Sequence, residues 1–183
     1  MQNTRLKVTG IVLVLALLGY GFALSDLNPL YHDDTYREVH KELTAGKMEN
    51  DLDTLAALYI KMYAGRKNKP CPCKDAAYVI TARHHGIFNR LYHFKLEREF
   101  SDEECIKFLL LHSEGGFGFG KKDVHQAAAY YFHKSVPELN EAEQITMLLL
   151  LENPSYFNPV RRRDKVSSTV RMYQNVLQAN EHN

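Results

Sequence analysis

Apolar residues recur every three or four positions over most of the chain, and this spacing is typical of α-helices. The stripes over residues 36–43, 52–59 and 166–177 show the spacing clearly. No segment of useful length alternates strictly between apolar and polar residues, and no hairpin signal or internal repeat is found. The pattern therefore predicts an all-α fold.

Helix starts are predicted where a capping residue precedes an apolar stripe. Asp51 or Asp53 is expected to cap the helix that ends near Gly65. Other capping pairs have the required spacing of three residues: Thr35 with Glu38, Ser101 with Glu104, Asp123 with Gln126, and Asn140 with Glu143.

Two stretches are predicted to interrupt the helices. Residues 66–74, with the sequence RKNKPCPCK, form a polar loop with two prolines, and a helix over 75–85 follows it. Residues 114–120 contain four glycines in seven positions, which costs too much backbone entropy for a stable helix. Between them, residues 87–100 are expected to form a further helix.

The first 24 residues differ from the rest of the chain. Residues 1–7 carry two basic side chains and no acid, residues 8–24 carry no charge, and acidic residues follow. We expect residues 1–7 to be cytoplasmic, 8–24 to be a transmembrane anchor in the inner (plasma) membrane, and 25–183 to form one periplasmic or extracellular helical domain. A cleaved signal peptide is the alternative, with Gly21 and Ala23 at its −3 and −1 positions.

Composition restricts the chemistry further. The net charge is +1 and no basic face is evident, so nucleic-acid binding has no electrostatic support. Outside the cytoplasm, a disulfide from Cys105 to Cys71 or Cys73 is favoured over a metal site, because zinc patterns require four ligands. The nine histidines lack metal-binding spacing, so no metal site is predicted.

An ordered set of motifs covers the second half of the chain. Residues 95–101 read KLEREFS, Gly118 and Gly120 form a glycine turn, residues 127–134 read AAAYYFHK, and residues 153–159 read NPSYFNP. With Arg171 further on, these motifs over 94–177 resemble the C-terminal half of the peptidoglycan glycosyltransferase domain, glycosyltransferase family 51. That bacterial domain occurs in class A penicillin-binding proteins and monofunctional transglycosylases.

The resemblance implies a lysozyme-like helical fold behind an N-terminal transmembrane helix. It also implies a reaction in which a sugar hydroxyl attacks a lipid-linked pyrophosphate donor, a carboxylate takes the proton and cations steady the pyrophosphate. The residues that fall at family motif positions are the candidate ligand-binding residues: Lys134, His125, Tyr131, Asn158 and Arg171.

The catalytic half of the family pattern is not found. The motif Glu-Asp-x-x-Phe-x-x-His-x-Gly has no counterpart, and residues 80–81 are at most a remnant of the motif rich in Gly, Thr and Gln. Counting back from Glu97, the family's second Glu falls on Asn89, and an amide cannot accept a proton as a carboxylate does. His125 stands where the Ala-Ala motif of the family has an acid.

Two further groups allow alternative interpretations. Arg161 to Arg163 with Lys165 can hold an anionic head group, although a solvated loop is slightly favoured. Tyr130, Tyr131 and Phe132 can stack on sugar rings, although packing against neighbouring helices is favoured.

We therefore expect a degenerate relative of the family: a membrane-anchored module that binds glycan or lipid-linked precursor, or that regulates cell-wall synthesis through a synthesis protein. The alternative is an active peptidoglycan transglycosylase with relocated carboxylates, for which Glu97 and Glu99 are the nearest candidates. A lytic enzyme has no motif support. No cofactor is expected, apart from a divalent metal if the chain is active.

Overall fold

The computed structural model describes residues 2–44, 50–64, 69–81, 87–113, 116–121 and 123–181. Every regular element in these ranges is helical, which confirms the predicted all-α class for them. Three short 3-10 turns, η1 (Pro29–His32), η2 (Asn50–Leu52) and η3 (Val136–Glu138), lie between longer helices. The α-helices are α1 (Gln2–Ala23), α2 (Asp34–Thr44), α3 (Asp53–Tyr63), α4 (Pro72–Ile80), α5 (Ile87–Glu99), α6 (Asp102–His112), α7 (Val124–Phe132), α8 (Glu141–Glu152) and α9 (Arg163–Glu181).

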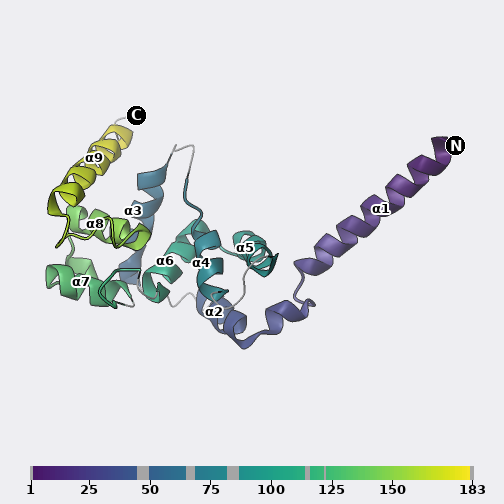
Figure 1. Cartoon of the computed structure of the whole chain (residues 1–183), viewed down its shortest axis with the longest axis horizontal. Helices are drawn as coiled ribbons and strands as arrows, with labels where there is room; N and C mark the ends of the chain where they lie inside the picture. Colours follow the sequence, from purple (N-terminus) through teal and green to yellow (C-terminus); the bar gives the residue numbers. More distant parts are fainter. Residues whose placement is uncertain are drawn as a thin grey trace.

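Helix α1 extends away from the body that the other helices form (Figure 1). Its large apolar side chains from Ile11 to Phe22 are exposed. No helix in the described part of the chain is both long enough and apolar enough to cross a membrane. The anchor over residues 8–24 stays a prediction.

The caps predicted in the second half of the chain are confirmed. Ser101 and Asn140 form complete capping boxes, and Asp123 accepts a hydrogen bond from the backbone N–H of Gln126 at 2.8 Å. The prediction for α3 is wrong, because η2 leads directly into the helix and leaves Leu52 at the cap without a side-chain bond. Helix α2 begins at Asp34, one residue before the predicted cap, whose side chain lies outside the described residues.

The loop predicted over residues 66–74 was too long. Helix α4 begins at Pro72, because proline fixes φ for the first helical turn and lacks only an N–H that would have no partner there. The helix ends at Ile80 rather than at residue 85, and Thr81 is its C-cap. Residues 82–86 and the predicted stops at Gly46 and Gly65 lie outside the described residues.

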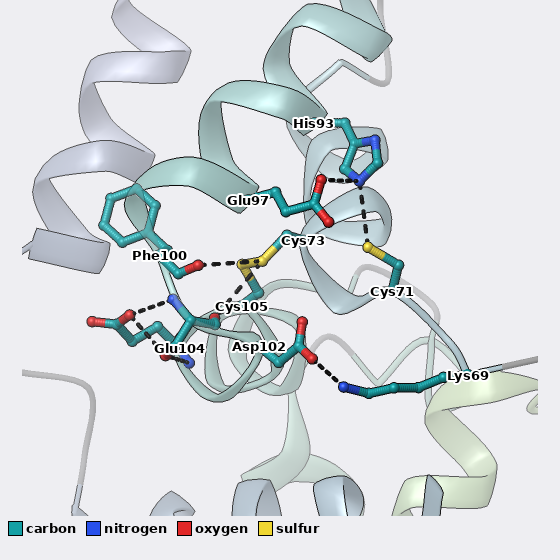
Figure 2. Close-up of a disulfide and its surroundings, with 10 residues drawn as sticks. Lys69, Cys71, Cys73, His93, Glu97, Phe100, Asp102, Glu104 and Cys105 are labelled. Atoms are coloured by element: carbon teal, nitrogen blue, oxygen red, sulfur yellow. Dashed lines mark hydrogen bonds and ion pairs between the residues drawn. A yellow bond between two sulfur atoms is a disulfide. The ribbon is translucent and has the colours of Figure 1, made fainter. Parts of the chain in front are cut away.

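The core forms where α4 packs on α5 and α6, and where α3 packs on α6, α8 and α9. Leu96, Ile106, Leu110 and Leu148 are fully buried in it. A disulfide between Cys73 and Cys105 joins α4 to α6 across a sequence separation of 32 residues (Figure 2). This confirms the predicted bridge to Cys105. Closing a loop of that length stabilises the folded state by about 3–4 kcal/mol in the chain-entropy view.

One buried ammonium group ties the end of α1 to α5. The Lys95 side chain is 3% exposed, and its Nζ donates to the Leu24 carbonyl at 3.1 Å and to Asp26 at 2.6 Å. It also pairs with Glu99, one turn later, at 2.6 Å. Burial acts to lower the pKa of Lys95, but the hydrogen bonds that it donates to the carboxylates of Asp26 and Glu99 outweigh burial and raise that pKa. Lys95 is therefore charged at neutral pH.

A cluster of three tyrosine rings lies beside this ammonium group. The Tyr31 hydroxyl donates to the carbonyl of Ala23 at 3.0 Å, and Lys95 Nζ lies 5.1 Å from the Tyr31 ring centroid. Tyr36 and Tyr92 pack their rings 5.3 Å apart beside it. Burial raises the pKa of Tyr31 to about 12, so its hydroxyl keeps its proton at neutral pH. Charge and aromatic packing together hold the α1 end in place.

Replacing Lys95 by Ala should lower the free energy of unfolding by about 2 kcal/mol, because it leaves the buried Leu24 carbonyl and the partly buried Glu99 carboxylate without their donor. Urea unfolding followed by circular dichroism measures the loss. Lys69→Ala is the matched control, since the Lys69–Asp102 pair is 43% and 35% exposed and should contribute about 0–1 kcal/mol. Equal losses in the two variants would contradict the role given to Lys95.

Candidate functional site

The glycine turn at residues 116–121 is fixed by a tyrosine from α7. The hydroxyl of Tyr131 donates to the carbonyl of Phe117 at 2.7 Å. Gly118 and Gly120 both have φ of +71°, a region that side chains disfavour. A Cβ added to Gly118 would lie 3.3 Å from the Tyr131 hydroxyl oxygen. Any side chain at position 118 would therefore be strained by the positive φ and would press on Tyr131.

The loop that follows α8 packs beside this turn. Gly118 faces Pro154 of that loop, and Asn158 is 4% exposed within it. The Asn158 side chain accepts the backbone N–H groups of Val160 and Arg161 at 3.0 and 2.9 Å. Burial raises the pKa of Tyr131, while the nearby Arg161 and Asn158 act to lower it. Two predicted binding residues, Tyr131 and Asn158, are thus brought together, and both serve the loop structure.

Exposed aromatic rings gather over these loops. Phe119, Tyr130 and Tyr156 are 45%, 44% and 41% exposed, and the rings of Phe119 and Tyr130 lie 5.8 Å apart. Phe119 also has a positive φ of 51°. A non-glycine residue in that region costs of order 1 kcal/mol or more, and such strain is concentrated at functional sites.

Basic side chains lie over the same rings. Their charged groups sit 4.4–5.7 Å from the ring centroids, within the range of cation–π attraction. We call this set the aromatic–cationic surface: Phe119, Tyr130 and Tyr156 with Lys121 over Tyr130, Arg161 over Phe119, and Arg162 and Lys165 over Tyr156.

The surface changes two interpretations made from the sequence. Arg161, Arg162 and Lys165 are exposed, as expected for a solvated loop, yet each lies over an aromatic ring. Tyr130 is exposed rather than packed, whereas Tyr131 is half-buried as expected. Phe119 and Lys121 were missed; the signal for Phe119 was a phenylalanine between two glycines, which a flexible turn does not require.

A second group of predicted residues borders a groove between α8 and α9. Lys134 Nζ pairs with both carboxylate oxygens of Glu143 at 2.7 Å. Burial acts to raise the pKa of Glu143, but the hydrogen bonds from Lys134 and Asn140 outweigh it and lower that pKa. Glu143 and Arg171 line the groove, whose volume is about 350 Å³. Lys134 is therefore held by an internal partner that an anionic ligand would have to replace.

The remaining predicted residues lie elsewhere. His125 is half-buried in the first turn of α7. Glu99 is held by Lys95 and lies 3.3 Å from His40, while Glu97 is exposed and lies 3.6 Å from His93. Both carboxylates are on α5, away in sequence and in element from the glycine turn and α7. Neither carboxylate belongs to the aromatic–cationic surface, and neither lines the groove between α8 and α9.

Asn89, at the predicted position of the family's second Glu, takes part in two consecutive hydrogen bonds. It is 8% exposed, and its amide donates to the Thr81 hydroxyl at 2.8 Å. That hydroxyl in turn donates to the Ala77 carbonyl at 2.7 Å. The amide at position 89 therefore links α5 to the end of α4 and carries no base.

One carboxylate with an unusual pKa was not marked by any motif. Glu152 is the last residue of α8, and the surrounding protein removes part of the carboxyl's hydration and raises its pKa to about 7. A pKa near neutrality suits proton transfer, but it arises here from desolvation alone. Glu152 is exposed as a residue, so contact with solvent keeps the effect of this shift on stability small.

Glu152→Gln should raise the melting temperature near pH 8 and leave it unchanged near pH 4. The folded pKa of about 7 exceeds the ordinary 4.5, so the unfolded chain ionises first and stability falls as pH rises between these values. Scanning calorimetry at both pH values measures the difference, with Glu103→Gln on exposed α6 surface as control. A variant no more stable than the wild type at pH 8 would contradict the shifted pKa.

Comparison with known proteins adds one finding. The pattern of the Transglycosylase family matches residues 87–179, just over half of the 183-residue chain. The match begins at the first residue of α5 and includes the glycine turn, α7, α8 and most of α9, which confirms the resemblance predicted over 94–177. No curated protein and no solved structure matches the chain significantly. The chain belongs to the Transglycosylase family.

Proposed function

We propose that this protein binds glycan or its lipid-linked precursor without polymerising it. Family membership relates the chain to peptidoglycan glycosyltransferases. The proposal that the protein does not polymerise rests on Asn89. Counting back from Glu97 assigns the family's second Glu to this position, where the chain has a buried amide bonded to Thr81. An amide at this position does not take the proton from the attacking sugar hydroxyl, so it does not support chain extension.

The binding half of the proposal rests on the aromatic–cationic surface. Aromatic faces stack on the apolar faces of sugar rings, and guanidinium groups pair with phosphate oxygens. Phe119, Tyr130 and Arg161 offer both kinds of contact within one exposed region. A precursor that carries sugars on a pyrophosphate matches both. Lys134 and Arg171 beside the α8–α9 groove offer further positive charge.

Attachment to the membrane through α1 is part of the same proposal. Its support is the run from Ile11 to Phe22, whose large apolar side chains are exposed, and the charge step on either side of residues 8–24. A domain held at the membrane would meet a lipid-linked precursor there. Regulation of a cell-wall synthesis protein is compatible with this location.

The full-length protein in detergent should form no polymer from labelled lipid-linked disaccharide-pentapeptide and a divalent metal. Gel separation of the labelled products measures polymerisation, with an active family member as positive control. Circular dichroism establishes that the preparation is folded. Polymer formation would contradict the proposal and favour an active transglycosylase, and Glu97→Gln and Glu99→Gln would then locate the base.

The same precursor should bind the folded protein, and Arg161→Ala with Tyr130→Ala should weaken binding by about five- to thirtyfold through loss of the cation and the ring. Fluorescence anisotropy of the labelled precursor measures the dissociation constant. Tyr78→Ala is the matched control, since Tyr78 is an exposed tyrosine on α4, outside the surface. A specific site would be contradicted if the Tyr78→Ala control lost as much affinity as the variant with Arg161→Ala and Tyr130→Ala. It would also be contradicted if the wild-type protein did not bind the precursor.

A further inference from the structure

Three side chains of different chemistry converge beside the disulfide. Cys71 immediately precedes α4, while His93 and Glu97 lie one turn apart on α5. Figure 2 shows all three pointing toward one another. The Cys71 Sγ lies 3.3 Å from His93 Nε2, and that nitrogen lies 3.6 Å from Glu97 Oε2. The three donor atoms are all within 4.8 Å of one another.

A hydrogen bond between Cys71 and His93 accounts for only one of the two contacts made at this nitrogen. Both the sulfur and the carboxylate oxygen approach the same nitrogen, which in a neutral ring either donates one hydrogen or offers one lone pair. The 3.6 Å separation from Glu97 also exceeds normal hydrogen-bond length. A relay of the Cys-His-acid type is excluded as well, because it would use the two different ring nitrogens.

The separations do fit ligands around a tetrahedral metal ion. Zinc bonds of roughly 2.3 Å to sulfur and 2.0–2.1 Å to nitrogen and oxygen place S and N ~3.5 Å apart, and N and O ~3.3 Å apart. The observed 3.3 and 3.6 Å lie within about 0.3 Å of those values. The third separation, from the Cys71 sulfur to the Glu97 carboxylate, is within 4.8 Å, against ~3.5 Å in such a site. The exposed Glu97 side chain closes the site by moving toward the sulfur.

We propose that Cys71, His93 and Glu97 form a binding site for a zinc-class divalent transition metal. A thiolate and a carboxylate balance the charge of a divalent ion, and the neutral imidazole supplies the third donor. Sulfur disfavours magnesium and calcium, which prefer oxygen ligands. On binding, the thiol proton passes to solvent and a metal–sulfur bond replaces the S–H bond.

The disulfide makes Cys71 the free sulfur of the three cysteines. Cys73 and Cys105 are bonded to each other, so a site of several thiolates cannot form while the bridge is intact. Cys73 is two residues from Cys71, and α4 packs closely on α5. The bridge therefore fixes the start of α4 and holds Cys71 close to His93.

The site leaves one coordination position for an external ligand. Three protein donors are found in the described part of the chain, and the Glu97 side chain is 57% exposed. Zinc sites with three protein ligands and a solvent-accessible fourth position bind water or an exogenous donor. This assigns Glu97 to a metal, in place of the proton transfer considered for it from the sequence.

The test is a cobalt(II) titration of the full-length, metal-stripped protein in detergent, without reductant so that the disulfide persists. One cobalt ion per chain should bind, with a near-ultraviolet sulfur-to-cobalt absorption and visible bands typical of four-coordination. Zinc(II) should displace it and magnesium(II) should not. Thiol titration should find one reactive thiol without metal and protection of that thiol with zinc.

Variants distinguish binding at this site from nonspecific metal binding elsewhere on the protein. Cys71→Ser should abolish the near-ultraviolet band, and Glu97→Gln, a change at an exposed position, should weaken zinc binding at least tenfold, since even outer partners of a ligand contribute 10–100-fold. His112→Ala is the matched control, because His112 pairs with Glu42 at 2.6 Å without a thiol. It should bind as the wild type does.

Three results would overturn the proposal. They are a folded wild-type protein that gives no cobalt–sulfur band, a band that persists in Cys71→Ser, and equal losses of affinity in Glu97→Gln and His112→Ala. Should Cys71→Ser fail to fold by circular dichroism, His93→Gln and Glu97→Gln give the same comparison. Polymerisation and precursor binding play no part in these readouts, so the result is independent of the proposed function.

Discussion

The Lys95 ammonium group is the contact on which the arrangement of the first half of the chain depends. It is buried, so its charge has to be matched from within the protein, and the match comes from the α1 end, from Asp26 and from Glu99. Taking the charge out of water is costly, and the bonds to these acceptors offset that cost. The bonds from Lys95 thus fix where the segment that follows α1 lies on α5. The tyrosine cluster around it then follows from apolar packing.

Helix α5 is the element that connects the features described here. Its side chains reach several neighbours: Lys95 meets the α1 end, Glu99 meets His40 of α2, Asn89 bonds Thr81 at the end of α4, and His93 meets Cys71. The family pattern begins at the first residue of this helix. The part of the chain before the match therefore packs on the family region through α5 and through the disulfide, rather than forming an independent unit.

Local signals in the sequence predicted most of the fold and little of the site. The caps at Ser101 and Asn140 were predictable because both partners lie within three residues. The role of Lys95 was not, since the Leu24 carbonyl is 71 residues away. The His93–Glu97 spacing of four residues was visible, yet without Cys71, at a separation of 22, it indicated nothing beyond a helix-surface pair. The aromatic–cationic surface likewise joins three separate segments that only folding brings together.

The Cys73–Cys105 bridge also governs what happens when the backbone is cut. The loop it closes contains most of α4, all of α5 and the start of α6. A protease that cleaves anywhere between residues 74 and 104 produces two pieces that stay covalently joined. The pieces migrate as one band in gel electrophoresis until a reductant breaks the disulfide. Because the core contacts between these helices do not depend on the intervening peptide bonds, such a nicked molecule keeps its pieces at high effective concentration and in register. Under oxidising conditions in which proteases act, the bridge therefore keeps the two parts of a cut chain joined.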